Sequence, residues 1–434
     1  MQYEVENKHI LLIKNLIWVY FILLLFEGAL RKWFLPSLST PLLVVRDPIA
    51  IGIIFFSIYY RLIYWNFYLV LILLISLVSM VASLLFGHGN LYVAIYGLRP
   101  LLLHFPLIFI VGTLLRQTDV EKIGKFILWL VLPMTLLVIL QFYSPQSAWV
   151  NRGIGADASG AGFGGALGYF RPPGTFSFTN GNTLFYGLAA CFAFYFWLVK
   201  STLPKWILIT ASIGIIIAVP LSISRSYFFQ VLLTLGFSAF CTLSNYKALG
   251  KGIFVLLAIG LIFLVLSQFS FFQTGIDVFI TRFESANEEE GGMSGVIGDR
   301  FLGGLFSAIF NAGEQPILGY GLGMGSNVGS TFLTGKKEFL IAEGEWARII
   351  GEMGFVLGLL LIAIRVSLGV SLFLASFKGL KSSYFLPWIL MSFGFLQIAI
   401  AGWAQPTSLG FSIFTGGLIL ASFQKDEKKE TKFD

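Results

Sequence analysis

The sequence predicts an all-α polytopic membrane protein, and three observations support this fold class. Only 12% of the 434 residues are charged and 57% are hydrophobic, whereas an ordinary soluble domain carries about 25% charged residues. The mean hydropathy is +0.84. The apolar residues form runs of about 20 residues, the length of a transmembrane helix, rather than the alternating segments of about ten residues that a barrel shows. We therefore expect the chain to lie in a lipid bilayer.

Apolar windows bounded by charges, proline or glycine predict about twelve spans of membrane length. They lie near 10–29, 42–60, 67–86, 94–115, 123–143, 183–200, 205–222, 226–244, 252–270, 349–376, 384–402 and 407–423. The second span contains Arg46 and Asp47. No small-residue cleavage site follows the first run, so we expect an uncleaved first span. The prediction is a single transmembrane domain over 1–434.

The positions of the lysines predict the orientation of these spans. With twelve spans both termini share one side, which we interpret as the cytoplasm. That side holds Lys8, Lys14, Arg61, Arg116, Lys122, Lys125, Lys200, Lys205, Lys247, Lys251, Lys378, Lys381 and the tail 424–434. The opposite side receives an outer loop, 144–182, and a larger outer loop with short helices, 271–348, between the ninth and tenth spans.

Arginine is the main basic residue on the predicted outer side. Most basic residues of the predicted outer side are arginines, namely Arg31, Arg152, Arg171, Arg225, Arg282, Arg300 and Arg348. The orientation of the spans is explained by basic residues on the cytoplasmic side, and it does not call for arginines on the outer side. The outer arginines therefore need another explanation.

Composition and spacing argue against several classes of function. The net charge of +7 does not indicate a nucleic-acid partner, because the basic residues are scattered over short loops. Cys191 and Cys241 lie in apolar runs and are interpreted as packing residues. His9, His88 and His104 are dispersed, and no Cys/His spacing matches a zinc pattern. We therefore predict no metal site.

A polar, glycine-rich island over 298–358 interrupts the apolar chain. Charges at a membrane edge are costly and usually have a role. Arg300 follows Asp299, which is expected to cap a short helix. The Arg300 guanidinium suits phosphate oxygens, and an ion pair with Asp299 is the alternative. The alternating glycines of PILGYGLGMGSNVG lack the GK[ST] of a phosphate loop, so we expect them to allow close backbone packing against another element or a ligand.

Carboxylates gather where AEGEWARII opens the helix of the tenth span. Glu345 and Arg348 are three residues apart, which predicts an ion pair within the helix. Both are also candidates for substrate binding. Glu343 precedes this helix and is either a cap partner or a general base that accepts a proton from the aqueous side.

Two further arginines are candidates for binding an anion. Arg225, in LSISRSYFF between the seventh and eighth spans, is flanked by Ser224 and Ser226. Its alternative role is that of a loop arginine reaching the lipid headgroups. Arg171 opens RPPGTFSFTNGN before the sixth span, where two prolines fix an extended backbone.

The remaining charged residues within the spans are interpreted as internal structural pairs. They are Arg46–Asp47 in the second span, and Arg99 and His104 in the fourth. What remains on the outer face is several arginines with one or two carboxylates. This set suits the binding of a diphosphate and the activation of a hydroxyl, which glycosyl transfer from a diphosphate-linked donor needs.

These segments resemble the O-antigen ligase and O-antigen (exopolysaccharide) polymerase family of membrane glycosyltransferases. The resemblance covers roughly 170–360 and rests on RPPGTFSFTNGN, SISRSYFF, GDR with the following PILGYGLG, and AEGEWARIIGEMG. It implies a GT-C-like fold in a bacterial inner membrane. The implied reaction is a metal-independent, inverting transfer of a glycan from a polyprenyl-diphosphate carrier to a glycan acceptor. No cofactor is implied, and other polysaccharide assembly proteins are possible partners.

The resemblance also assigns roles by position. Arg225 and Arg300 resemble the family arginines that hold the diphosphate. The family's histidine falls at Glu343, which implies that this carboxylate takes the acceptor proton. The first glycine of the same signature is Gly354, and the second is displaced by one residue to Gly358. These departures favour a polymerase-like or divergent member.

The main alternative is a transporter or flippase of an anionic or lipid-linked solute. About twelve spans is a common size for such proteins, but they often show repeated halves with broken helices near mid-membrane. The sequence shows no such internal symmetry. A non-catalytic scaffold in an export complex is a third hypothesis.

Overall fold

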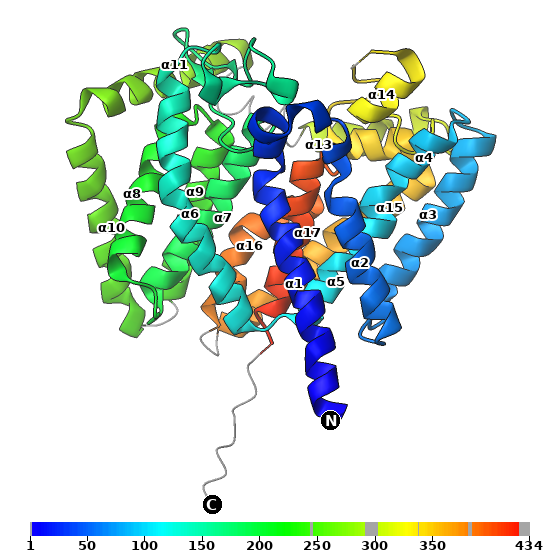
Figure 1. The fold of residues 1–434 in the computed structure, drawn as a ribbon, viewed down its shortest axis with the longest axis horizontal. Coiled ribbons are helices and arrows are strands. Elements are labelled where there is room, and N and C mark those ends of the chain that lie inside the picture. Colours follow the sequence, from blue (N-terminus) through cyan, green and yellow to red (C-terminus); the bar gives the residue numbers. More distant parts are fainter. Residues whose placement is uncertain (1, 244–245, 291–302, 337, 381–383, 425–434) are drawn as a thin grey trace, which may run out of the picture.

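The chain folds into an all-α bundle of long helices (Figure 1). The computed structural model describes residues 2–243, 246–290, 303–336, 338–380 and 384–424. Within these residues, seven helices are long and apolar enough to cross a membrane. The bent pair Leu257–Leu266 and Ser270–Ser285, with an angle of 104°, raises the number to eight if it is one span. The molecule is therefore an all-α, multi-pass membrane protein.

The prediction of about twelve spans is wrong in number. α8 (Lys205–Leu221), α16 (Phe385–Ala399) and α17 (Pro406–Ala421) are apolar but contain only 17, 15 and 16 residues. At 1.5 Å per residue they extend about 23–26 Å, which is less than the ~30 Å hydrocarbon core. The expected spans 205–222, 384–402 and 407–423 run one to three residues past the C-terminal ends of these helices, so each apolar run in the sequence is longer than the helix it forms.

The N-terminal part of the chain supplies five of the seven long spans. Its elements are α1 (Gln2–Ala29), η1 (Leu30–Phe34), η2 (Pro36–Leu38), η3 (Pro41–Val44), α2 (Arg46–Tyr59), α3 (Phe67–Leu85), α4 (Leu91–Leu98), η4 (Arg99–His104), α5 (Phe105–Leu114) and α6 (Gln117–Tyr143). Asparagines begin two of them, because Asn66 Oδ1 accepts the Leu69 N–H and Asn90 Oδ1 accepts those of the first turn of α4.

A largely irregular connection joins α6 to α7. It contains η5 (Trp149–Asn151), η6 (Ile154–Ala156), β1 (Phe163–Gly164) and β2 (Phe170–Arg171). The two strands are antiparallel and pair Phe163 with Arg171.

The C-terminal part contains the remaining helices. They are α7 (Thr179–Leu198), α8, α9 (Arg225–Leu243), α10 (Tyr246–Leu266), α11 (Ser270–Glu290), α13 (Gly304–Phe310), η8 (Asn311–Glu314), α14 (Asn327–Thr334), α15 (Glu345–Leu380), α16 and α17. The region predicted as a large outer loop thus contains helices. α11 follows α10 after the sharp bend and lies across one end of the bundle (Figure 1).

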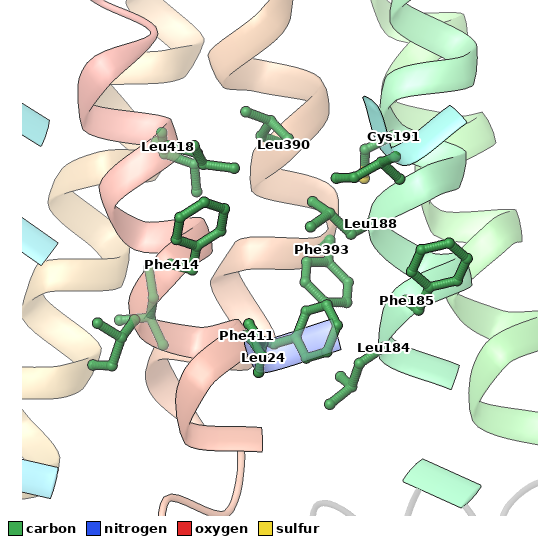
Figure 2. Packing of buried hydrophobic residues seen from close by; sticks show 14 of the residues in the cluster. Leu24, Leu184, Phe185, Leu188, Cys191, Leu390, Phe393, Phe411, Phe414 and Leu418 are labelled. Atoms are coloured by element: carbon green, nitrogen blue, oxygen red, sulfur yellow. The ribbon is translucent and has the colours of Figure 1, made fainter. Parts of the chain in front are cut away.

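Helices α7, α16 and α17 form the centre of the core. In the most apolar stretch of α7, 89% of the residues are buried, whereas the share is 33% in the first membrane-length helix, Lys8–Phe34, which contains most of α1. Figure 2 shows α1, α7, α16 and α17 meeting through Leu24, Phe185, Phe393 and Phe414. Cys191 is in this cluster, and Cys191 and Cys241 are both free and buried, which agrees with their predicted packing role.

Small residues allow α5 and α17 to pack closely in this core. A Cβ added to Gly417 of α17 would lie 2.6 Å from Val111 of α5, and one added to Gly112 of α5 would lie 2.4 Å from Leu420. Close approach through small residues is how helices associate where lipid offers no hydrophobic driving force.

The two ends of the bundle differ in what they carry. α1 begins and α17 ends at the same end, which we call the terminal end (Figure 1). There Lys14 pairs with Asp119 at 2.5 Å, and Lys125 donates to Thr202 at 2.7 Å. The described parts of 144–178 and 267–344 lie at the opposite end, which we call the loop end.

Candidate functional site

A break in α15 receives the glycine loop, which we define as residues 319–325. Gly354 has φ +80° and ψ 177°, a conformation that interrupts the helix. The Glu352 carbonyl accepts the Gly321 N–H at 3.0 Å, and the preceding carbonyl accepts the Tyr320 N–H at 2.8 Å. The glycine loop therefore supplies partners for backbone groups that a break leaves without helical hydrogen bonds.

The alternating glycines are needed because three stretches of backbone meet here. Gly319 and Gly323 have positive φ angles of +73° and +82°. A Cβ on Gly319 would lie 2.4 Å from the Glu352 carbonyl oxygen, and one on Gly323 would lie 2.4 Å from the Val93 carbonyl oxygen of α4. The prediction that these glycines allow close backbone packing is confirmed.

Gly354→Ala is expected to destabilise the protein. A non-glycine residue in this conformation costs about 1–3 kcal/mol, and the added Cβ would lie 2.0 Å from the Ile317 carbonyl oxygen. Denaturant unfolding of the purified protein in detergent would measure the change. Gly236→Ala in α9 is the matched control, because its Cβ meets nothing within 4 Å and alanine favours the helix. Equal stability of the two variants would contradict the assigned strain.

Four buried or half-buried charges of α15 pair with one another, and we call them the Glu345 network: Glu345 and Arg348 in the first turn, and Glu352 and Arg365 further along the helix. Glu345 accepts hydrogen bonds from Arg348 at 2.9 and 3.0 Å and from Arg365 Nη1 at 2.7 Å. The Trp403 N–H donates to the same carboxylate at 3.0 Å. Arg348 Nη1 lies 2.6 Å from Glu352. The predicted ion pair of Glu345 with Arg348 is therefore confirmed.

Arg365 joins this network from a later turn of α15 and was not predicted as a site residue. Its side chain is fully buried, and it donates to the carbonyls of Ile398 and Ala401 at 2.9 and 2.7 Å. Ile398 is in the last turn of α16 and Ala401 lies two residues beyond it, so Arg365 caps that end of the helix. A single arginine inside the apolar run LLLIAIRVSL is the sequence signal that could have found it.

A second ion network joins α2 to η4. Asp47 binds Arg99 through both carboxylate oxygens, and His104 Nε2 lies 3.2 Å from Asp47 Oδ1. Tyr20 of α1 contacts His104 Nδ1 at 2.9 Å. These contacts confirm the prediction that Asp47, Arg99 and His104 form internal structural pairs. Arg46 is paired with Glu27, at 3.4 Å.

The segment 171–177 (RPPGTFS) is fixed by α1 and α6. Lys32 is fully buried and donates to the Gly174 carbonyl at 2.7 Å. Gln141 of α6 binds both backbone groups of Gly174. On α1, a Cβ added to Gly28 would lie 2.3 Å from the Ser177 nitrogen. Our sequence analysis missed Lys32 and Gln141, because their partners are backbone atoms far away in the sequence.

Three arginines come together at the loop end: Arg171 on β2, Arg225 at the start of α9 and Arg282 on α11. We call them the arginine group. Burial lowers the pKa of Arg171, and the positive charges of Arg282 and Arg225 lower that pKa further. Its Nε is buried and has no hydrogen-bond partner among the described residues. A cluster of mutually repelling guanidinium groups can bind a multivalent anion.

The structure brings together some of the predicted site residues. The charges of Arg225 and Arg282 both act on Arg171, and Arg282 does so from α11, which at 21 residues is longer than the short helices expected in the outer loop. Glu345 and Arg348 are held in the Glu345 network. Glu343 is exposed, two residues before the start of α15. Arg300 lies outside the described residues.

The fold and the charges together define a multi-pass, all-α membrane protein with a polar loop end. No protein-family model matches the chain, and no curated protein matches it significantly. The resemblance to the ligase and polymerase family therefore rests on the residues quoted above.

Proposed function

We propose that this protein transfers a glycan from a polyprenyl diphosphate to an acceptor sugar on the outer face of a bacterial inner membrane. The single observation that supports this most is the arginine group, because three guanidinium groups share one region at the loop end. Arginine binds phosphate oxygens through two parallel hydrogen bonds. The negative charge and the several oxygens of a diphosphate suit a group of guanidinium side chains.

The proposed reaction is an inverting displacement at the anomeric carbon of the donor. The acceptor hydroxyl oxygen forms the new bond to this carbon while the bond to the diphosphate oxygen breaks. The diphosphate leaves as the polyprenyl diphosphate, with its charge stabilised by Arg225, Arg171 and Arg282, and by Arg300 on the grounds of the resemblance. Glu343 accepts the acceptor proton as general base. The donor is already activated, so the proposal invokes neither a metal nor a nucleotide.

The proposed orientation places the loop end outside and the terminal end in the cytoplasm. Lys14 and Lys125 at the terminal end support this, because lysine is enriched on the cytoplasmic side. α1 begins and α17 ends there, so both termini would be cytoplasmic.

A transporter of an anionic or lipid-linked solute is the alternative, and the break in α15 favours it. Interrupted helices often form the substrate sites of transporters. The same assay separates the two proposals. Purified protein in proteoliposomes is supplied with a polyprenyl-diphosphate glycan and an acceptor. Glycan lengthening or transfer with release of polyprenyl diphosphate supports the enzyme, whereas movement of the lipid-linked glycan across the bilayer without either product supports the transporter.

Glu343→Ala is expected to reduce product formation by about 10²–10⁴-fold, the usual contribution of a general base. Glu343 is exposed, so protein yield and unfolding midpoint should stay as in the wild type. The assay is the rate of polyprenyl diphosphate release. Glu338→Ala, which changes another exposed carboxylate of the same connection, is the matched control. Near-normal release by Glu343→Ala would remove Glu343 from the mechanism.

A further inference from the structure

We infer that α13 and the residues directly after it dip into the lipid bilayer at the loop end, although they lie between the spanning helices in the sequence. The surface concerned consists of Phe306, Phe310 and Ile317, and we call it the α13 surface. Its partner is the boundary between the headgroups and the acyl chains of the adjacent leaflet. The inference goes beyond the proposed function, because it holds equally for a glycosyltransferase and for a transporter.

The helix α13 is apolar almost all round. Its seven residues are GLFSAIF, with Ser307 as the only polar side chain and no charge. A helix at a water-facing surface carries polar side chains on its outer face, whereas a helix that is apolar on every side is buried in a protein core or in a membrane. The sequence of α13 therefore favours apolar surroundings on more than one of its sides.

The bundle covers one side of α13 and leaves another side exposed. Ala308 of α13 and Ala312 of η8 are buried, and both elements pack on α15. Two residues correspond to about 200° of rotation around a helix, so Phe306 and Phe310 lie opposite Ala308. Their exposed fractions are 55% and 80%. The two rings stack on one another, with centroids 6.3 Å apart, and form one apolar surface.

The α13 surface continues into the lipid-facing side of a spanning helix. Ile317 is 73% exposed and lies directly beside the break in α15, because its carbonyl oxygen would be 2.0 Å from a Cβ on Gly354. Phe355 and Val356 follow this glycine and are 41% and 56% exposed. They belong to Glu345–Leu380, which is long and apolar enough to cross a membrane. Lipid around this helix therefore reaches the neighbouring α13 surface.

This continuity favours lipid over a protein partner. An exposed apolar patch marks either a protein partner or a membrane, and here the bilayer around α15 covers the patch without any further component. Phenylalanine rings have no polar atom that would keep them at the headgroup level, where tyrosine and tryptophan gather. Interfacial helices bury their apolar face about 5–10 Å into this boundary. The exposed Glu314 of η8 is the first charge after α13 and marks the return to the headgroups.

The depth of a spin label at position 310 tests this inference. Phe310→Cys in the full-length protein is labelled with a nitroxide and reconstituted into vesicles of phosphatidylethanolamine and phosphatidylglycerol. The native Cys191 and Cys241 are buried, so the label should attach to the new thiol alone. Power-saturation EPR then compares collisions with oxygen, which concentrates in lipid, and with a water-soluble nickel chelate. We expect the ratio of oxygen to nickel collisions to be several-fold higher at position 310 than at a water-exposed position.

Two control positions calibrate this ratio. Ser159→Cys, on an exposed turn of the loop end, is the reference for water, and Val78→Cys, on the exposed side of the spanning helix α3, is the reference for lipid. A ratio at position 310 as low as that at position 159 would overturn the inference. Few collisions with either reagent would also overturn it, because protein would then cover the α13 surface. Ile317→Cys gives the same test at a second position if Phe310→Cys does not fold.

Discussion

Replacing Glu345 by alanine is expected to lower the free energy of unfolding by about 3–5 kcal/mol, the usual cost of breaking a buried ion pair. Glu345 accepts hydrogen bonds from two arginines and from the Trp403 N–H. Without it, the fully buried Arg365 keeps its charge but loses its only carboxylate among the described residues. Because the Trp403 ring also stacks on Arg365, at 3.9 Å, the loop between α16 and α17 should loosen.

Denaturant unfolding in detergent, followed by tryptophan fluorescence, measures this change. Glu343→Ala is the matched control, because it removes an exposed carboxylate two residues earlier in the chain. The two variants should separate stability from activity, with Glu345→Ala unstable and Glu343→Ala stable but inactive. If Glu345→Ala unfolds at the wild-type midpoint, Glu345 does not hold this part of the fold together.

The fold class was predictable because composition alone decides it. A chain with 12% charged residues cannot surround its apolar surface with polar residues. The number of membrane-length helices was not predictable in the same way, since α8, α16 and α17 are shorter than their apolar runs. Helix ends depend on prolines and on partners from other helices. The Arg365 bonds to the Ile398 carbonyl in the last turn of α16 and to the Ala401 carbonyl just after it are one example.

The candidate site was predictable only where its contacts are local. The Glu345–Arg348 pair follows from a spacing of three residues on a helix. The glycine pattern indicated close backbone packing but not its partner, because the break at Gly354 lies about 30 residues further along the chain. Arg282 illustrates the same limit. It reaches Arg171 through the bend between α10 and α11, and a sequence pattern does not encode that bend.

Arg171→Ala is expected to lower the rate of glycan transfer by about ten- to a hundredfold. A hydrogen bond between charged groups contributes about 1.5–3 kcal/mol, and each 1.4 kcal/mol corresponds to a factor of ten. The buried Arg171 Nε, without a hydrogen-bond partner among the described residues, is the donor that we expect a phosphate oxygen to satisfy. Arg171→Lys should be intermediate, because it keeps the charge but loses the fork geometry. Release of polyprenyl diphosphate measures both variants.

The stability of Arg171→Ala shows whether Arg171 is kept for ligand binding or for the fold. Like charges from Arg225 and Arg282 act on Arg171, so its removal should leave the unfolding midpoint unchanged or raise it. Lower activity combined with equal or higher stability is the signature of a residue kept for function. Arg152→Ala, an exposed arginine of the same connection, should change neither property. If Arg171→Ala instead lowers stability and keeps full activity, the arginine group supports the fold, and the diphosphate would have to bind elsewhere.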